Sequence, residues 1–132
     1  MKLGASPAIL NLEAAPRGLY AARPIGAQTF FHANQYETLN IPQSYGNSSV
    51  HRIARVKQMV PPPDTPAAFA HALGDQQDHS WPIFHDEASH KAGDLSDWTL
   101  ATALFDLRAK TLQIFWGNPR HGVVLRHLAL PA

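Results

Sequence analysis

An asparagine at the end of an apolar run is the first residue of this sequence whose type and position could do chemistry. Residues 29–38 read TFFHANQYET, and polar residues follow the β-favouring Thr29, Phe30 and Phe31. At a strand end, the amide N–H of Asn34 can stabilise the negative oxygen of a tetrahedral intermediate, a contribution of about 3 kcal/mol. Asparagine is also a common turn residue, because it tolerates left-handed backbone. The residue alone leaves both interpretations open.

A second group of candidates lies in the segment GNSSVHRIARVKQMV, which contains Ser48, Ser49, His51 and Arg52. A serine nucleophile needs an activating base and an orienting group. Serines at a predicted helix start are more often caps, and the sequence has no G-x-S-x-G elbow. Arg52 is either a solvated side chain or one that reaches a carboxylate, a nucleophile or an anionic substrate.

Eight histidines are many for this length, and His79, Asp86 and His85 or His90 are the candidates for a metal site. Metal ligands must converge on one point, and these residues lack a recognisable ligand spacing. We therefore expect scattered surface and core histidines and no metal. The sequence has no G-x-G-x-x-G or phosphate-loop motif, and we expect no cofactor.

Composition excludes several classes of protein. The chain has no cysteine, so it contains no disulfide, thiolate metal site or cysteine nucleophile of its own. Its net charge is +1 and its basic residues are scattered, which argues against nucleic-acid binding. The sequence contains no run of 18 apolar residues, so no membrane span is predicted. We expect a cytoplasmic protein that acts on neither nucleic acid nor membrane.

The elements that position these residues are predicted in the order strands, helices, strands. We expect strands over residues 8–14, 19–23 and 28–32, helices over 48–60 and 66–73, and strands over 98–107, 111–117 and 123–130. Asn47 or Ser48 is the expected cap of the first helix and Asp64 or Thr65 that of the second. Pro24–Gly26 is an expected turn.

The segment between the second helix and the last strands, residues 74–97, is rich in His, Asp, Gly and Ser. We expect it to be an irregular connection with at most one short strand at Trp81–Phe84. The element order favours an antiparallel α+β fold, in one domain of 132 residues. The first and last strands are expected to join one sheet, with the helices on one face and the other face uncovered.

These segments, taken in order, resemble the C-terminal half of the penicillin acyltransferase family, the acyl-coenzyme A:6-aminopenicillanate acyltransferases. The matching stretches begin with ILNLEAAP and TFFHANQYET and continue with GNSSVHRIARVKQMV, LGDQQDHSWPIF and TLATALFDLRAKTLQIFWGNPRHGVVLRHLAL. The family consists of N-terminal-nucleophile (Ntn) hydrolases, related to carcinine hydrolases and to bile-salt and penicillin V amidases. The resemblance implies part of an αββα sandwich of two antiparallel sheets.

The resemblance also implies roles for individual residues. Asn34 matches the asparagine that holds the oxyanion or orients the substrate, although Ala33-Asn34-Gln35 replaces the commoner Thr-Asn-His. Arg52 matches an arginine that positions the nucleophile or substrate, and Ser48 or Ser49 matches the serine before it. Family members use an N-terminal Cys as nucleophile, with its α-amino group as base.

This chain lacks that cysteine. We therefore expect a C-terminal fragment of an amidohydrolase or acyltransferase that is inactive alone. Its small-molecule amide or acyl substrate would be processed only when an N-terminal chain supplies the Cys. An alternative is a non-catalytic α+β domain that binds a partner or small molecule, with Asn34 in a turn and Arg52 solvated.

Overall fold

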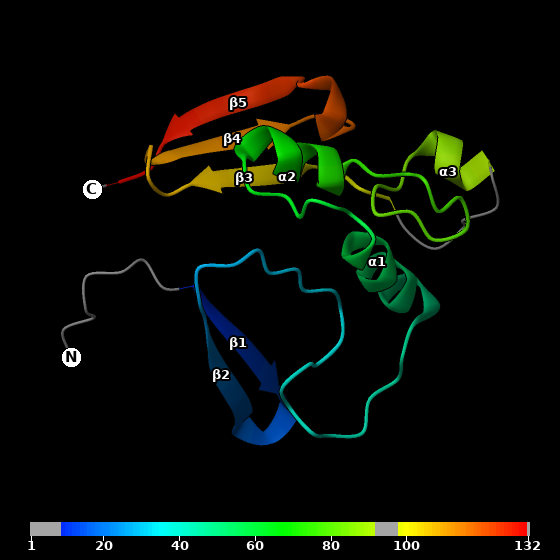
Figure 1. Cartoon of the computed structure of the whole chain (residues 1–132), viewed down its shortest axis with the longest axis vertical. Helices are drawn as coiled ribbons and strands as arrows, with labels where there is room; N and C mark the ends of the chain where they lie inside the picture. The colour runs from blue at the N-terminus through cyan, green and yellow to red at the C-terminus, as the bar shows by residue number, and fades with distance from the viewer. Residues whose placement is uncertain (1–8, 92–97, 132) are drawn as a thin grey trace.

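The computed structural model describes residues 9–91 and 98–131, which fold into two antiparallel sheets and three α-helices (Figure 1). The α+β class predicted from the sequence is confirmed. The expectation of one joined sheet is wrong, because strands β1 (Ile9–Ala15) and β2 (Leu19–Ile25) pair only with each other. Strands β3 (Thr102–Asp106), β4 (Thr111–Phe115) and β5 (Val124–Ala129) form a separate sheet in the order β3-β4-β5.

The N-terminal hairpin has one apolar face that nothing covers among the residues that the structure describes. Leu10 pairs with Pro24, Leu12 with Ala22, and Ala14 with Tyr20, so these six side chains share a face. All six are exposed, including Leu12 at 61% and Tyr20 at 72%. The opposite face carries the buried residues Glu13 and Ile25. The expected turn at Pro24–Gly26 is wrong for Pro24 and Ile25, which lie within β2.

The third strand predicted over residues 28–32 does not form, and residues 26–46 are a long loop (Figure 1). A strand needs a neighbouring backbone ladder. Here the Gln28 N–H donates to the Gly26 carbonyl at 2.7 Å, and the Thr29 hydroxyl donates to the Pro63 carbonyl. The loop therefore leaves the sheet and runs toward the helices, and the expected meander is a simple hairpin.

Helix α1 (Asn47–Lys57) begins one residue earlier and ends three residues earlier than predicted. Its N-cap is Gly46, and no side chain caps it, so the expected Asn47 or Ser48 cap is wrong. Helix α2 (Pro66–Leu73) has the predicted bounds, and the Thr65 hydroxyl accepts from the Ala68 N–H at 3.2 Å. The proline after a threonine cap makes this helix start easy to recognise.

The connection after α2 contains a short helix that the sequence analysis missed, α3 (Glu87–Lys91). Asp86 caps it, because its Oδ1 accepts from the N–H groups of Ala88 and Ser89 at 2.9 and 3.0 Å. No strand forms at Trp81–Phe84. Instead, the N–H groups of Ile83 and Phe84 both donate to the Asp75 carbonyl at 3.0 Å.

The described core is small and lies mainly where α2 and the following connection meet the three-stranded sheet. Phe84 and Phe115 are buried there, at 2% and 5% exposure. Thr102 is also buried, and Leu104 is half-buried on the same face of β3, which α2 contacts. On the other face, Phe105 and Leu128 are largely exposed. Both sheets thus present one covered face and one open apolar face.

Candidate functional site

Arg52 contacts all three of the other predicted site residues, although it reaches Ser48 only through the main-chain carbonyl. Arg52 lies in the second turn of α1, and its Nη2 donates to Asn34 Oδ1 at 3.0 Å and to Ser49 Oγ at 3.2 Å. Its Nε donates to the carbonyl oxygen of Ser48 at 3.3 Å. The arginine therefore links the long loop to the start of the helix.

This contact determines the orientation of the Asn34 amide. A guanidinium group carries only donors, so the atom that faces it must be the amide oxygen. The Asn34 nitrogen then points to the opposite side of the planar amide group, away from the arginine. Asn34 itself is exposed, whereas Ala33 before it is buried. The loop consequently presents the side-chain N–H of Asn34 at the surface, next to the buried residue Ala33.

The two serines differ, although they are adjacent in the sequence. Ser49 is buried and accepts from Arg52. The hydroxyl of Ser48 is also buried, but it has no hydrogen-bond partner among the described residues. His51, the possible base for a serine, contacts Asp78 instead, with 2.7 Å between Nδ1 and Oδ2. The described contacts therefore contain no serine–histidine pair.

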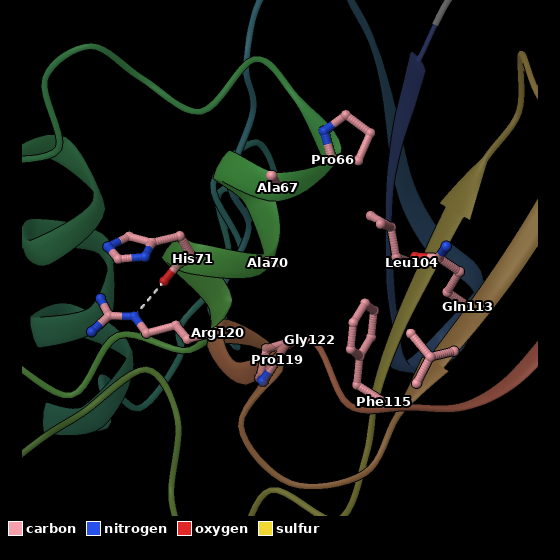
Figure 2. Close-up of a pocket in the computed structure, with 11 residues that line it drawn as sticks. Pro66, Ala67, Ala70, His71, Leu104, Gln113, Phe115, Pro119, Arg120 and Gly122 are labelled. Carbon is pink, nitrogen blue, oxygen red and sulfur yellow. Dashed lines mark hydrogen bonds between the residues drawn. The ribbon is translucent and has the colours of Figure 1, made fainter.

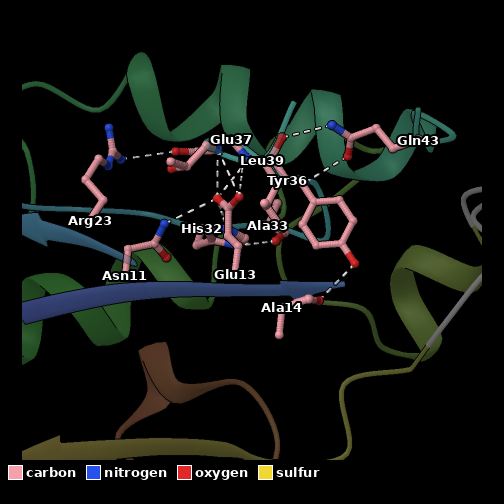
Figure 3. A network of polar contacts seen from close by, with 11 residues as sticks. Asn11, Glu13, Ala14, Arg23, His32, Ala33, Tyr36, Glu37, Leu39 and Gln43 are labelled. Atoms are coloured by element: carbon pink, nitrogen blue, oxygen red, sulfur yellow. Dashed lines mark hydrogen bonds and ion pairs between the residues drawn. The ribbon is translucent and has the colours of Figure 1, made fainter. Parts of the chain in front are cut away.

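A buried carboxylate that the sequence analysis missed holds the loop that carries Asn34 (Figure 3). Glu13 projects from β1 with its side chain 1% exposed. Its two oxygens accept from the backbone N–H groups of Glu37 at 2.8 Å, Thr38 at 2.9 and 3.1 Å, and Leu39 at 2.8 Å. Three consecutive N–H groups thus converge on one carboxylate and define the backbone course just after Asn34.

The same carboxylate also reaches the residues just before Asn34. His32 Nε2 lies 3.3 Å from Glu13 Oε1, and His32 Nδ1 contacts the Ala33 carbonyl (Figure 3). Asn11 Nδ2 donates to Glu13 Oε1 at 3.3 Å. Burial by itself raises the pKa of Glu13, but the three backbone N–H bonds and His32 outweigh it and lower the pKa to about 2. Glu13 is therefore ionised at neutral pH and clamps the loop on both sides of Asn34.

The sequence pattern around Glu13 points to the wrong face of the strand. In ILNLEAA, Leu10 and Leu12 share one face, so a half-buried strand would cover the leucines and leave Glu13 in solvent. The structure has the reverse, with Glu13 buried and both leucines exposed, and a buried charge needs a partner. The sequence could not name that partner, because it is main-chain N–H of a loop 24 to 26 residues away.

A second buried carboxylate, Asp75, is held by side chains rather than by a loop backbone. Arg55 of α1 binds it through two bonds of 2.8 and 2.9 Å, and Arg120 binds it at 2.6 Å. Burial raises the pKa of Asp75, but these guanidinium groups and the Gln77 N–H outweigh it and lower the pKa. Asp75 therefore ties α1 and the end of α2 to the turn after β4.

A cavity of about 530 Å³ lies between α2 and the covered face of the three-stranded sheet (Figure 2). Leu104 and Phe115 form part of its apolar wall. Arg120 lies at its edge, where its Nε donates to the His71 carbonyl at 2.8 Å. None of Asn34, Ser48, Ser49 and Arg52 lines this cavity. This cavity lies between helix and sheet and is separate from the cluster formed by Asn34, Ser48, Ser49 and Arg52, the Asn34–Arg52 cluster.

The histidine-rich connection does not assemble a metal site within residues 9–91 and 98–131. No group of three or more His, Asp or Glu side chains there could hold a metal ion. Asp86 caps α3, and the His90 ring lies against Trp98 in a tilted arrangement with 5.5 Å between ring centroids. Across the same residues, no helix is long and apolar enough to cross a membrane.

The described part of the chain is thus an antiparallel α+β fold in which the Asn34 amide and the Arg52 guanidinium group meet near the start of a helix. Comparison with known protein families identifies the family. The model of the family acyl-coenzyme A:6-aminopenicillanic acid acyl-transferase matches residues 3–121, and the chain belongs to this family. Neither the curated proteins nor the solved structures contain a significant match.

Proposed function

We propose that this chain is the C-terminal, oxyanion-binding part of an Ntn-type amidohydrolase or acyltransferase. The observation that carries the proposal is the bond from Arg52 to Asn34 Oδ1, which turns the asparagine N–H away from the arginine. Membership of an acyl-transferase family supplies the class of reaction. The substrate would be a small molecule with a linear amide or thioester bond.

In the proposed reaction, a cysteine thiolate attacks the substrate carbonyl, and the C=O bond becomes a C–O⁻ bond. The Asn34 N–H donates to this oxygen, which contributes about 3 kcal/mol in the transition state. Collapse of the intermediate breaks the C–N bond and expels the amine, which takes the proton that the α-amino group accepted from the cysteine thiol. The resulting thioester is then cleaved by water or by a second amine. Arg52 keeps Asn34 oriented and favours the thiolate by its charge.

The cysteine must come from outside this sequence, which has none. A polypeptide that begins with Cys would bring the nucleophile to Asn34. The exposed apolar face of the β1–β2 hairpin supports such a partner, because exposed apolar patches commonly mark contact surfaces. The purified chain alone should then show no hydrolysis of N-acyl substrates, and turnover by the chain alone would refute this part of the proposal.

The decisive experiment mixes the chain with a Cys-initiated polypeptide encoded beside it and follows hydrolysis of a chromogenic N-acyl amide. Asn34→Ala should lower kcat by a factor of about 10² to 10³. Asn40→Ala, an exposed asparagine of the same loop, is the matched control and should leave kcat unchanged. Equal losses for both variants would show that Asn34 has no special role.

The open apolar faces also support a second candidate, a non-catalytic domain that binds a partner protein. In that case Asn34 would be a turn residue. The same mixture separates the candidates, because the enzyme would hydrolyse the N-acyl amide and lose activity with Asn34→Ala, whereas the non-catalytic domain would bind its partner without any turnover.

A further inference from the structure

The cavity between α2 and the three-stranded sheet has no part in the proposed reaction, yet it has the size of a small-molecule site (Figure 2). Its volume of about 530 Å³ lies within the range of cavities that hold small ligands. Ala67 and Ala70 of α2 line one side, and the sheet lines the other with Leu104, Phe115 and Val124. The wall is therefore mainly apolar, and the short alanine side chains leave space between helix and sheet.

Gln113 supplies a hydrogen-bonding group within this apolar wall. It lies on the covered face of β4, directly across from Leu104 on β3, and it is half-buried. Its side-chain amide makes no hydrogen bond to any other residue that lines the cavity (Figure 2). An amide group offers a carbonyl acceptor and two N–H donors, so a ligand in the cavity could use both kinds of hydrogen bond.

The charged group at the edge of the cavity is already paired. Arg120 Nη2 donates to the carboxylate of Asp75 at 2.6 Å, and Arg120 Nε donates to the His71 carbonyl at 2.8 Å. In Figure 2 the guanidinium group of Arg120 points away from Leu104 and Phe115. A charged ligand would lose its hydration against the apolar wall without gaining a charged partner. The cavity therefore favours an uncharged ligand.

We propose that this cavity binds a small uncharged molecule that has an apolar body and one primary amide group. The apolar body would lie between α2 and the sheet, and the ligand amide would pair with the amide of Gln113 through two hydrogen bonds. A ligand in this position would contact both helix and sheet and would stabilise their packing. The inference is independent of the proposed function, because the cavity is separate from the Asn34–Arg52 cluster and its ligand needs no cysteine.

Benzamide and toluene separate the amide contact from the apolar contact, because both have a benzene ring and only benzamide has the amide. In NMR titrations of the full chain, benzamide should bind saturably with a Kd of about 1 mM or below. Gln113→Leu should weaken benzamide binding about tenfold and should leave toluene binding unchanged or tighter. The absence of saturable benzamide binding, or equal losses for the two compounds in Gln113→Leu, would overturn the proposal.

Ala70→Leu tests the place of binding, because the larger side chain would occupy part of the cavity. Binding of both compounds should weaken by about tenfold or more, since side chain and ligand compete for the same space. Ala68→Leu is the matched control, because Ala68 is on the same helix and does not line the cavity. Equal affinities of the two variants, in chains that thermal unfolding shows to be folded, would place the ligand elsewhere and refute the proposal.

Discussion

Glu13 and Asp75 are both buried carboxylates, but the molecule holds them in different ways. Three consecutive backbone N–H groups of one loop bind Glu13, whereas two arginine side chains from separate elements bind Asp75. The first arrangement defines the course of a single loop, the one that carries Asn34. The second joins elements that are distant in the sequence. Glu13 thus positions the loop that carries Asn34, whereas Asp75 stabilises the packing of separate elements against one another.

Removal of Asp75 should have the largest effect on stability. Asp75→Ala leaves two guanidinium groups without their shared partner, and we expect the free energy of unfolding to fall by about 3 kcal/mol or more. Urea unfolding measures this loss. Asp64→Ala is the control, since Asp64 is exposed, and it should change stability by less than about 0.5 kcal/mol. If both variants unfold alike, Asp75 does not join the elements energetically.

Glu13→Gln should destabilise the chain less and disturb the loop more. Hydrogen bonds to a charged acceptor contribute about 1.5 to 3 kcal/mol, and the neutral amide satisfies the three N–H donors poorly. Amide hydrogen exchange should accelerate at Glu37, Thr38 and Leu39. In the reconstituted enzyme, kcat should fall, because this loop positions Asn34. Unchanged exchange at these three amides would remove the distinction between the two carboxylates.

The pH dependence sharpens the same comparison. The pKa of Glu13 lies at about 2 in the folded chain and has an ordinary value of 4.5. Because the folded pKa is the lower one, the carboxylate stabilises the fold above pH 4.5 and loses this contribution as the pH falls toward 2. The pKa of Asp75 is also lowered, so wild type should lose stability from both groups. The difference in the free energy of unfolding between wild type and Glu13→Gln, measured in urea, should therefore shrink between about pH 5 and pH 2. A difference that stays constant over this range would contradict the prediction.

Gly74→Ala tests the Asp75 region without changing any charge. A Cβ at Gly74 would lie 2.1 Å from Asn118 Oδ1 and 2.6 Å from Arg120 Cγ, so both side chains would have to move. We expect a loss of about 1 to 3 kcal/mol in thermal or urea unfolding. Gly26→Ala is the control, because nothing lies within 4 Å of its Cβ position. If Gly74→Ala leaves the free energy of unfolding unchanged, the side chains of Asn118 and Arg120 can move aside without cost.

The smallest effects should distinguish the two adjacent serines. Ser48→Ala removes a buried hydroxyl that has no described partner, and stability should stay the same or rise by up to about 1 kcal/mol. Ser49→Ala removes an acceptor of Arg52 and should cost about 1 kcal/mol. A loss of stability in Ser49→Ala without a loss in Ser48→Ala, measured by urea unfolding, would support the different contacts of the two serines. Equal losses of stability in both variants would contradict them.

The sequence predicted the elements that depend on local signals. Helix α2 was found with its bounds because Thr65, Pro66 and Gly74 mark its ends. The last three strands were found because their β-favouring runs are separated by turns, although each is shorter than predicted. The strand expected at residues 28–32 failed because its residues favour a strand but have no neighbouring ladder, which is a tertiary condition.

The candidate site was predicted in part. Asn34, Arg52 and the serines were chosen from type, position and family resemblance, and the structure places them in contact. Their catalytic role stays a prediction. Glu13 was missed because its partners are backbone N–H groups, which every sequence contains and no sequence pattern marks. The separation of the two sheets was also missed, since strand order alone does not say which strands pair.

The tryptophan that follows β4 gives the chain an optical reporter of its own. Trp116 is 66% exposed, and Trp98 is 52% exposed, whereas Trp81 lies against the His51 ring with 6.0 Å between ring centroids. A partner that covers the open face of the three-stranded sheet would move Trp116 from water into an apolar environment. Its fluorescence emission would then shift to shorter wavelength, and assembly could be followed in real time without any label.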